Sequence, residues 1–286
     1  MTLTIAIVAF NAREDLERCL ASLAAAPPGC QHEVVVIDNG STDGAPDMVQ
    51  AAFPHVRLLR APRNLGFSAG NNLAIRDGRS EFVLLLNPDT IVPAGAVDRL
   101  IEVLRSHPEA AAIGPRLVDG RRRAELSFGP MPSPLGEAWQ KTLGAAHDRG
   151  LWPLHQWVDA ATRRDGEVAW VSGACLLVRR TDAVAVGLLD EQFFLYWEDV
   201  DFCAALRAAG RTVRFTARVE VTHLRGRSTA GVRRATADAY RRGQLAFYRK
   251  WRPRWAALLG LYLRARGHYP HGAPEASPPP ARIRLP

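Results

Sequence analysis

The sequence has few cysteines and no long apolar run. Its four cysteines, among 286 residues, form no CxxC pair and show no regular spacing, so we expect buried thiols in a reducing compartment rather than a disulfide framework. The best apolar run, at 255–263, is flanked by arginines and is too short to span a bilayer. No basic segment precedes the first apolar run, so we expect no signal peptide. These absences predict a cytoplasmic protein, with attachment to the inner face of the cell membrane as the alternative.

The chain also lacks the two common phosphate-binding motifs. Neither GxGxxG nor GxxxxGK[ST] occurs, which argues against a dinucleotide-binding fold and a P-loop.

Acidic residues are missing near the end of the sequence. No Asp or Glu lies between 239 and 274, while the whole chain carries a net charge of +8 and a pI of about 9.9. A basic protein favours an anionic partner: nucleic acid, anionic lipid or a phosphorylated substrate.

The stretch EFVLLLNPDTI, at 81–91, is the centre of the predicted fold. The apolar run Phe82–Leu86 is typical of a strand buried on both faces. Pro88 cannot continue a central strand, so Asp89 should lie at the carboxyl end of that strand, where α/β sheets bind ligands. Its carboxylate suits a divalent cation that holds a diphosphate, and it suits equally a turn that only ends the strand.

Strand-like and helix-like segments alternate through the first half of the chain. Strands are predicted at 3–10, 33–37, 56–59 and 82–86, with helical segments between them. This alternation predicts an α/β fold, a mostly parallel sheet flanked by helices. The polar, Gly-rich segments that follow the strands should gather at one sheet edge and form a ligand site.

The domain organisation follows from where the pattern changes. Residues 1–230 are predicted to form one α/β domain, in which 119–167 lacks a regular pattern and is interpreted as an insertion or mobile loop. Residues 231–266 are predicted to form a basic, amphipathic helical extension that Pro253 splits in two. The Pro-rich tail, 267–286, is expected to be disordered.

Several polar residues are candidates for chemistry, each with a structural alternative. Asp38 follows a buried strand and suits either a turn or a hydrogen bond to a nucleobase. The segment 64–72 suits either a diphosphate neighbour or a plain helix start. The negative charges of Glu198 and Asp199 would stabilise the N-terminus of a helix. For these two residues considered by themselves, this structural role is the preferred interpretation, although a general base also fits. His223 alone favours a structural role, but together with Asp89 it suits Mn²⁺ or a similar cation.

Taken together, these segments resemble the family 2 glycosyltransferases, and most of all bacterial rhamnosyltransferases that build cell-wall or surface polysaccharide. The resemblance spans about residues 4–251 and depends on six motifs in order. They are DNGSTDG (38–44), NLGFSAGNN (64–72), LLNPDT (85–90), SGACLLVRR (172–180), YWEDVDFC (196–203) and HLRGRST (223–229).

This resemblance implies a GT-A fold, a Rossmann-like sheet, and an inverting transfer of a sugar from a nucleotide-diphosphate donor. The implied donor is dTDP-rhamnose, the cofactor a divalent cation such as Mg²⁺ or Mn²⁺, and the acceptor a glycan or a polyprenyl-diphosphate-linked glycan. The implied roles are catalytic base for Asp199, donor binding for Ala9, Phe10, Asn11, Asp38, Asn64, Gly66, Asn87 and Asp89, acceptor binding for Trp170, Gly173, Trp197 and Glu198, and metal binding for Asp89 and His223. Asn87 stands where the family has the first Asp of its DXD motif, and an amide is a weaker metal ligand than a carboxylate.

Two other classes of function remain open from the residues alone. A nucleotidyltransferase acting on sugar phosphates also presents acids at strand ends, but it would lack the aromatic–Glu–Asp helix start and the downstream histidine. A nucleic-acid-binding module is suggested only by the pI, and we expect no nucleic-acid partner. The basic, aromatic segment after Trp251 suggests instead an anionic membrane surface as a partner.

Overall fold

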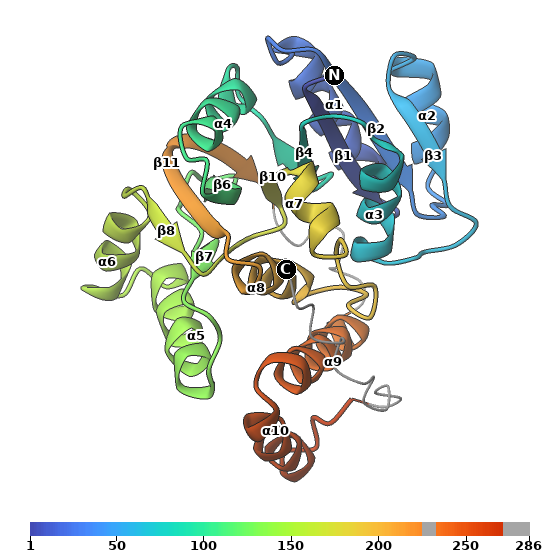
Figure 1. Ribbon diagram of the computed structural model, residues 1–286. Coiled ribbons are helices and arrows are strands. Elements are labelled where there is room, and N and C mark those ends of the chain that lie inside the picture. Colours follow the sequence, from blue (N-terminus) through green and yellow to red (C-terminus); the bar gives the residue numbers. More distant parts are fainter. Residues whose placement is uncertain (225–232, 271–286) are drawn as a thin grey trace.

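A computed structural model of the protein describes residues 1–224 and 233–270 (Figure 1). Within these residues, a large sheet has the strand order β3-β2-β1-β4-β10-β6-β11-β5, and β8 pairs with β11. Its strands are β1 (Leu3–Ala9), β2 (His32–Asp38), β3 (Arg57–Arg60), β4 (Phe82–Leu86), β5 (Thr90–Ile91), β6 (Ala110–Val118), β8 (Gly166–Val168), β10 (Cys175–Arg179) and β11 (Thr212–His223). A small second sheet joins β7 (Phe128–Gly129) to β9 (Trp170–Val171).

The sheet is mostly parallel, as predicted. The four neighbouring strands β3, β2, β1 and β4 all run parallel to one another, and β6 runs parallel to β11. Strand β10 is antiparallel to both β4 and β6 and therefore joins the two parallel groups. Because β1, β2 and β4 share one direction, the residues that follow their carboxyl ends meet at one edge of the sheet.

Helices cover both faces of this sheet. One face packs against α1 (Arg13–Ala25), α2 (Ala45–Ala52) and α4 (Ala96–Arg105). The other packs against α3 (Phe67–Asp77), α7 (Arg180–Ala185) and α8 (Glu198–Ala208). Strand β4 contributes Phe82 and Leu84 to the first core and Val83 and Leu85 to the second, which confirms the strand as buried on both faces.

The segment 119–167 is more regular than its sequence suggests. It contains α5 (Pro134–Asp148) and α6 (Leu154–Ala161), two helices that the expectation of an insertion or mobile loop did not specify. Ser133 caps the N-terminus of α5, because its Oγ accepts a hydrogen bond from the Gly136 amide at 3.1 Å. Pro134 follows as the first residue of the helix, a position that proline favours. Gly136 and Gly144 within α5, and Gly150 and Pro153 between the two helices, interrupt the pattern by which helices are recognised in a sequence.

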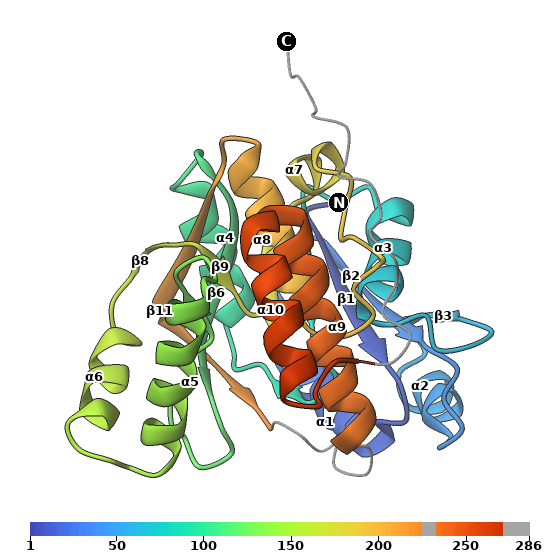
Figure 2. The ribbon, with the colours of Figure 1, turned by 90° about the horizontal axis from the view of Figure 1, so that it is seen from below.

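The C-terminal part forms two helices that pack against each other and lie side by side in Figure 2. They are α9 (Arg233–Trp251) and α10 (Pro253–Ala265), and the predicted break at Pro253 is confirmed. Aromatic residues of α9 join a core cluster with residues of α8. Of the predicted disordered tail, 271–286 lies outside the described residues. Within the described ranges, no helix combines the length and apolar character that crossing a bilayer requires.

Three of the four thiols are buried, as the sequence suggests. Cys19, Cys175 and Cys203 are buried, Cys30 is half-buried, and none of the four is in a disulfide. Burial raises the pKa of the Cys19 thiol to about 12, so this side chain is an inert part of the core.

Candidate active site

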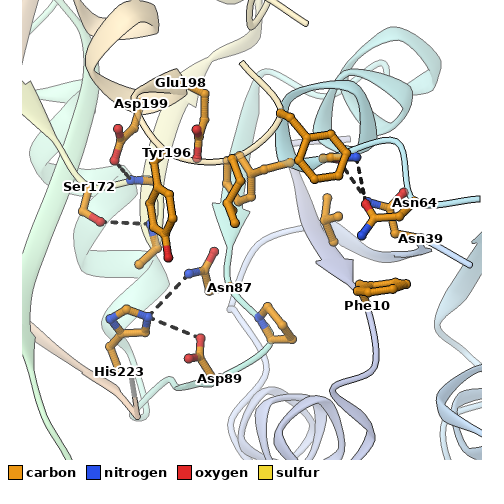
Figure 3. Close-up of a pocket in the computed structure, with 18 residues that line it drawn as sticks. Phe10, Asn39, Asn64, Asn87, Asp89, Ser172, Tyr196, Glu198, Asp199 and His223 are labelled. Atoms are coloured by element: carbon orange, nitrogen blue, oxygen red, sulfur yellow. Dashed lines mark hydrogen bonds and ion pairs between the residues drawn. The ribbon is translucent and has the colours of Figure 1, made fainter. Parts of the chain in front are cut away.

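A cavity of about 530 Å³ opens where the parallel strands end (Figure 3). The expected site residues that line it are Phe10, Asn64, Gly66, Asn87, Asp89, Gly173, Glu198, Asp199 and His223. Five other expected residues do not line it: Ala9, Asn11, Asp38, Trp170 and Trp197. The cavity wall also includes residues of the quoted motifs to which no role had been assigned, among them Asn39, Ser172 and Tyr196.

Strand pairing brings Asp89 and His223 together from distant parts of the sequence. Strand β5 pairs antiparallel with the end of β11, with Thr90 opposite His223, and the Leu224 amide donates to the Asp89 carbonyl at 2.8 Å. As a result, His223 Nε2 lies 3.3 Å from Asp89 Oδ1. The remainder of the predicted histidine motif, 225–229, lies outside the described residues.

Glu125 is a site residue that sequence reasoning missed. It is buried, and its Oε2 lies 3.1 Å from His223 Nδ1, on the side of the ring opposite Asp89. Burial lowers the pKa of His223, but hydrogen bonds to Asp89 and Glu125 outweigh this effect and raise it to about 9. No motif could have identified Glu125, because it lies in the irregular segment 119–167 and reaches the site only through tertiary folding.

The Asp89–His223 pair suits a divalent cation by its donor chemistry. A carboxylate oxygen and an imidazole nitrogen are ligands that Mn²⁺ and related ions accept. A carboxylate that hydrogen-bonds the other ring nitrogen, as Glu125 does, commonly orients a metal-binding histidine. In residues 1–224 and 233–270, no group of three or more His, Cys, Asp and Glu side chains is arranged to hold a metal ion. Asn87 Nδ2 lies 3.4 Å from His223 Nε2 on the same wall.

Asp199 lies on the opposite side of the cavity from Asp89, in the first turn of α8 (Figure 3). Its Oδ2 accepts a hydrogen bond from the Gly173 amide at 3.0 Å, and its Oδ1 accepts one from the Val200 amide at 2.8 Å. Burial raises the pKa of Asp199, while these backbone amides oppose the increase. The carboxylate is therefore oriented and more basic than a solvated aspartate, which are the properties of a general base.

Glu198 lies next to Asp199 in a drier environment. It is 7% exposed, and its Oε2 has no hydrogen-bond partner among the described residues. Burial, and then the neighbouring Asp199 charge, raise its pKa well above the usual range. Of the two adjacent acids, Glu198 is therefore protonated more readily, and the residue lines the cavity.

Amide side chains and a tight turn form a third wall. Asn39 Nδ2 donates to Asn64 Oδ1 and to the Gly66 carbonyl, both at 3.1 Å, while Asn39 Oδ1 accepts from the Leu65 amide at 3.1 Å. Gly66 has a φ of 85°, and a Cβ there would lie 2.5 Å from the Phe194 carbonyl oxygen. Only glycine lets the turn before α3 approach the loop before α8 so closely.

The expected site residues outside the cavity have structural partners. Asp38 Oδ1 accepts from the Ser41 amide at 3.0 Å, which is the turn that the sequence offered as an alternative. Asn11 Oδ1 accepts a hydrogen bond from the Thr42 amide at 2.8 Å, so it connects the end of β1 to the same turn.

The other three expected residues outside the cavity are also held by the fold. Trp170 Nε1 donates to the Pro130 carbonyl at 3.1 Å. Trp197 packs among aromatic residues of α9, and Ala9 is buried.

Comparisons with known proteins agree on one family. A model described as "Glycosyl transferase family 2" matches residues 4–181. An N-acetylglucosaminyl-diphospho-decaprenol L-rhamnosyltransferase of Mycobacterium tuberculosis is 34% identical over 243 residues, which cover 79% of this chain and 77% of that protein.

Solved structures of glycosyltransferases share the fold. GalNAc-T7 with UDP, GalNAc and Mn²⁺ has a TM-score of 0.63 at 14% identity, covering 93% of this chain and 50% of that one. A mannosyltransferase from Pyrobaculum calidifontis with GDP-Man and Mn²⁺ has a TM-score of 0.58 at 16% identity, covering 92% of this chain and 75% of that one. The central sheet and its helical layers therefore have the GT-A arrangement.

Proposed function

Because this chain belongs to the family 2 glycosyltransferases, we propose that it transfers L-rhamnose from dTDP-rhamnose to a hydroxyl of a lipid-linked or glycan acceptor. Glycosyl transfer itself follows from the family. The sugar and the acceptor are suggested by the mycobacterial relative, whose name describes rhamnosyl transfer with an N-acetylglucosaminyl-diphospho-decaprenol. The catalytic domain would be residues 1–230, with 119–167 as an insertion and 231–266 as an extension.

The observation that carries this proposal is that one cavity holds an oriented carboxylate and a histidine–carboxylate pair on opposite sides. An acceptor hydroxyl beside Asp199 would lose its proton to that carboxylate and attack the anomeric carbon. The bond to the nucleotide diphosphate would break on the far side, next to Asp89 and His223. Attack and departure on opposite faces give a single displacement with inversion.

Asp89 and His223 would hold a divalent cation, Mg²⁺ or Mn²⁺, with Glu125 orienting the histidine. Such a cation supplies positive charge that stabilises a departing diphosphate. Both solved neighbours described above contain Mn²⁺ with a nucleotide or nucleotide sugar. At the cation site, Asn87 would contribute an amide where the family motif has a carboxylate.

The remaining wall would bind the rest of the donor. The Phe10 ring is 42% exposed and lies at the end of β1, beside the end of β2, where a base could stack on it. Asp38, opposite Ala9 in that pairing, would accept a hydrogen bond from the base. Asn64 and Gly66 would contact the ribose and the diphosphate, while Gly173 and Glu198 would contact the acceptor.

Product analysis tests the proposed function. With dTDP-L-rhamnose and a short-chain N-acetylglucosaminyl-diphospho-prenol, the protein should release dTDP and form a rhamnosylated lipid, measured by mass spectrometry. NMR of the product should show the anomeric configuration opposite to that of the donor. Release of pyrophosphate would indicate nucleotidyl transfer instead. Turnover of a different nucleotide sugar, with dTDP-rhamnose inert, would contradict the proposed donor.

We also propose that α10 attaches the protein to an anionic membrane surface. Its outer face exposes Trp255, Leu258, Leu261 and Tyr262, each between 47% and 62% exposed. Arginines lie at both ends of the helix, and no acidic residue lies between 239 and 274. Aromatic and leucine side chains beside basic residues are typical of helices that lie at a membrane interface. Each basic residue near an anionic surface contributes about 1 kcal/mol.

Vesicle flotation tests this attachment. Full-length protein should float with phosphatidylglycerol vesicles at low salt and be released at high salt. The double variant Leu258→Ser, Leu261→Ser should remain in solution, whereas Val184→Ser, which alters an apolar side chain of similar exposure on α7, should float normally. Removal of all residues after Trp251 should also abolish flotation while nucleotide binding persists. Wild-type protein that stays free of these vesicles at low salt would refute the proposal.

A further inference from the structure

The backbone just before Asp199 has an unfavourable conformation. Tyr196 and Trp197 have φ values of 69° and 74°, in the left-handed region that side-chain-bearing residues avoid. Such residues persist only where surrounding contacts hold them in place. Trp197 also precedes the first residue of α8, so its conformation sets the direction in which that helix and Asp199 leave the loop.

Helix α9 packs closely against these two residues. A Cβ on Gly243 of α9 would lie 2.6 Å from the Tyr196 carbonyl oxygen and 3.1 Å from Trp197 Cδ1. The Trp197 side chain is 6% exposed, and its ring centroid lies 5.2 Å from that of Phe247 and 5.7 Å from that of Tyr240. The absence of a side chain at Gly243 therefore lets α9 pack directly on the strained backbone.

A second contact joins the end of α9 to the first turn of α8. Lys250 Nζ donates to Asp201 Oδ2 at 2.9 Å and to Asp190 Oδ2 at 2.7 Å, while Trp251 Nε1 donates to Asp201 Oδ1 at 2.7 Å. Asp201 is 1% exposed and lies two residues after Asp199. Burial raises the pKa of Asp201, and the Lys250 charge opposes this, so loss of Lys250 would leave a buried carboxylate without its cation.

We propose that α9 positions the catalytic base, with Gly243 and Lys250 as positioning residues that act on Asp199 through Tyr196–Trp197 and Asp201. This inference rests on the proposed role of Asp199. Displacement of a reacting group by 1 Å can lower a rate by about 10²-fold, so contacts that fix the first turn of α8 affect turnover directly. The family match ends at residue 181 and therefore includes neither α8 nor α9.

A pair of glycine variants distinguishes a role of Gly243 in positioning Asp199 from an effect on the stability of the whole protein. Gly243→Ala and Gly260→Ala each add a methyl group inside a helix, where alanine is the better helix former. Within the described part of the chain, the added Cβ at Gly260 would meet only Arg264 and Tyr269, both at an ordinary 3.9 Å. We expect Gly260→Ala to match wild type in kcat and melting temperature. Gly243→Ala should lower kcat by about tenfold or more, while the Kd for dTDP should change by less than about twofold.

A set of charge variants tests the second contact. Lys250→Met should lower kcat without weakening dTDP binding, and Lys250→Arg should restore part of the loss, because arginine keeps the charge and the donors. Arg211→Met is the matched control, since Arg211 donates to the Asp182 carboxylate at 3.0 Å beyond the other end of α8. Hydrogen exchange followed by mass spectrometry should show faster exchange at residues 198–202 in Lys250→Met and unchanged exchange there in Arg211→Met.

The exchange experiment distinguishes failure of this inference from failure of the proposed function. If wild-type protein shows no sugar transfer, the function is wrong, yet exchange at 198–202 still reports whether α9 holds α8. If Gly243→Ala and Lys250→Met retain wild-type kcat and wild-type exchange at 198–202, α9 does not position Asp199. Equal losses of kcat and dTDP binding would also overturn the inference, because they indicate general unfolding. If Gly243→Ala does not fold, the comparison of Lys250→Met with Lys250→Arg decides.

Discussion

Replacement of Asp199 by asparagine should lower the rate of sugar transfer by about 10²–10⁴-fold and leave dTDP binding nearly unchanged. Asparagine keeps the size of the side chain and can still accept a hydrogen bond from the Gly173 amide, but it cannot take a proton from an acceptor hydroxyl. The two quantities to measure are kcat for rhamnosyl transfer and the Kd for dTDP. Near-normal transfer by a folded Asp199→Asn protein would remove Asp199 from the role of base.

Glu198→Gln is the control for this variant, because it changes the adjacent acid in the same helical turn. Burial already favours the protonated, neutral form of Glu198, so an amide there should reduce transfer far less than Asp199→Asn does. Wild-type kcat/KM should also fall as the pH decreases through the pKa of Asp199. Because burial raises that pKa, the fall should begin above the pH expected for a solvated aspartate, and it should be absent from the residual activity of Asp199→Asn.

The second large effect concerns the proposed cation. EDTA should abolish transfer by the wild-type protein, and added Mn²⁺ or Mg²⁺ should restore it. Asp89→Ala and His223→Ala should each weaken the Mn²⁺-dependent binding of dTDP, measured by calorimetry, because each removes one of the two proposed protein ligands. We expect a loss of about tenfold or more, since replacement of a residue that only hydrogen-bonds a metal ligand typically costs about 10–100-fold in metal affinity.

Two milder variants sharpen this test. Asn87→Asp replaces an amide ligand with a carboxylate beside the pair and should tighten Mn²⁺ binding. Glu125→Gln keeps an oxygen near His223 Nδ1 but removes the charge, so it should weaken binding less than His223→Ala does. Full activity of the wild-type protein in EDTA would exclude the cation from the reaction and assign His223 a structural role.

The residues that end strands could be recognised from the sequence. The apolar run at Phe82–Leu86, followed by Pro88, was sufficient to predict a central strand with Asp89 at its carboxyl end, because a buried strand and a proline break are local properties of the chain. The same reasoning grouped Asn64 and Asn87 near one sheet edge, where they line the cavity, whereas Phe10 was expected there only from the family resemblance. It could not decide whether Asp38 binds a ligand or only forms a turn, since both use the same carboxylate.

Other parts of the site depend on contacts between distant segments. Glu125 reaches His223 across 98 residues of sequence, and Lys250 reaches Asp201 across 49. Neither residue belongs to a motif, because side-chain pairing of this kind leaves no periodic or local signal. The sequence alone therefore determined the α/β alternation, the strand ends and the family of this protein. Only the tertiary structure decided which acids are buried, how the histidine is oriented and which helix holds the first turn of α8, because burial and orientation arise when separate segments pack together.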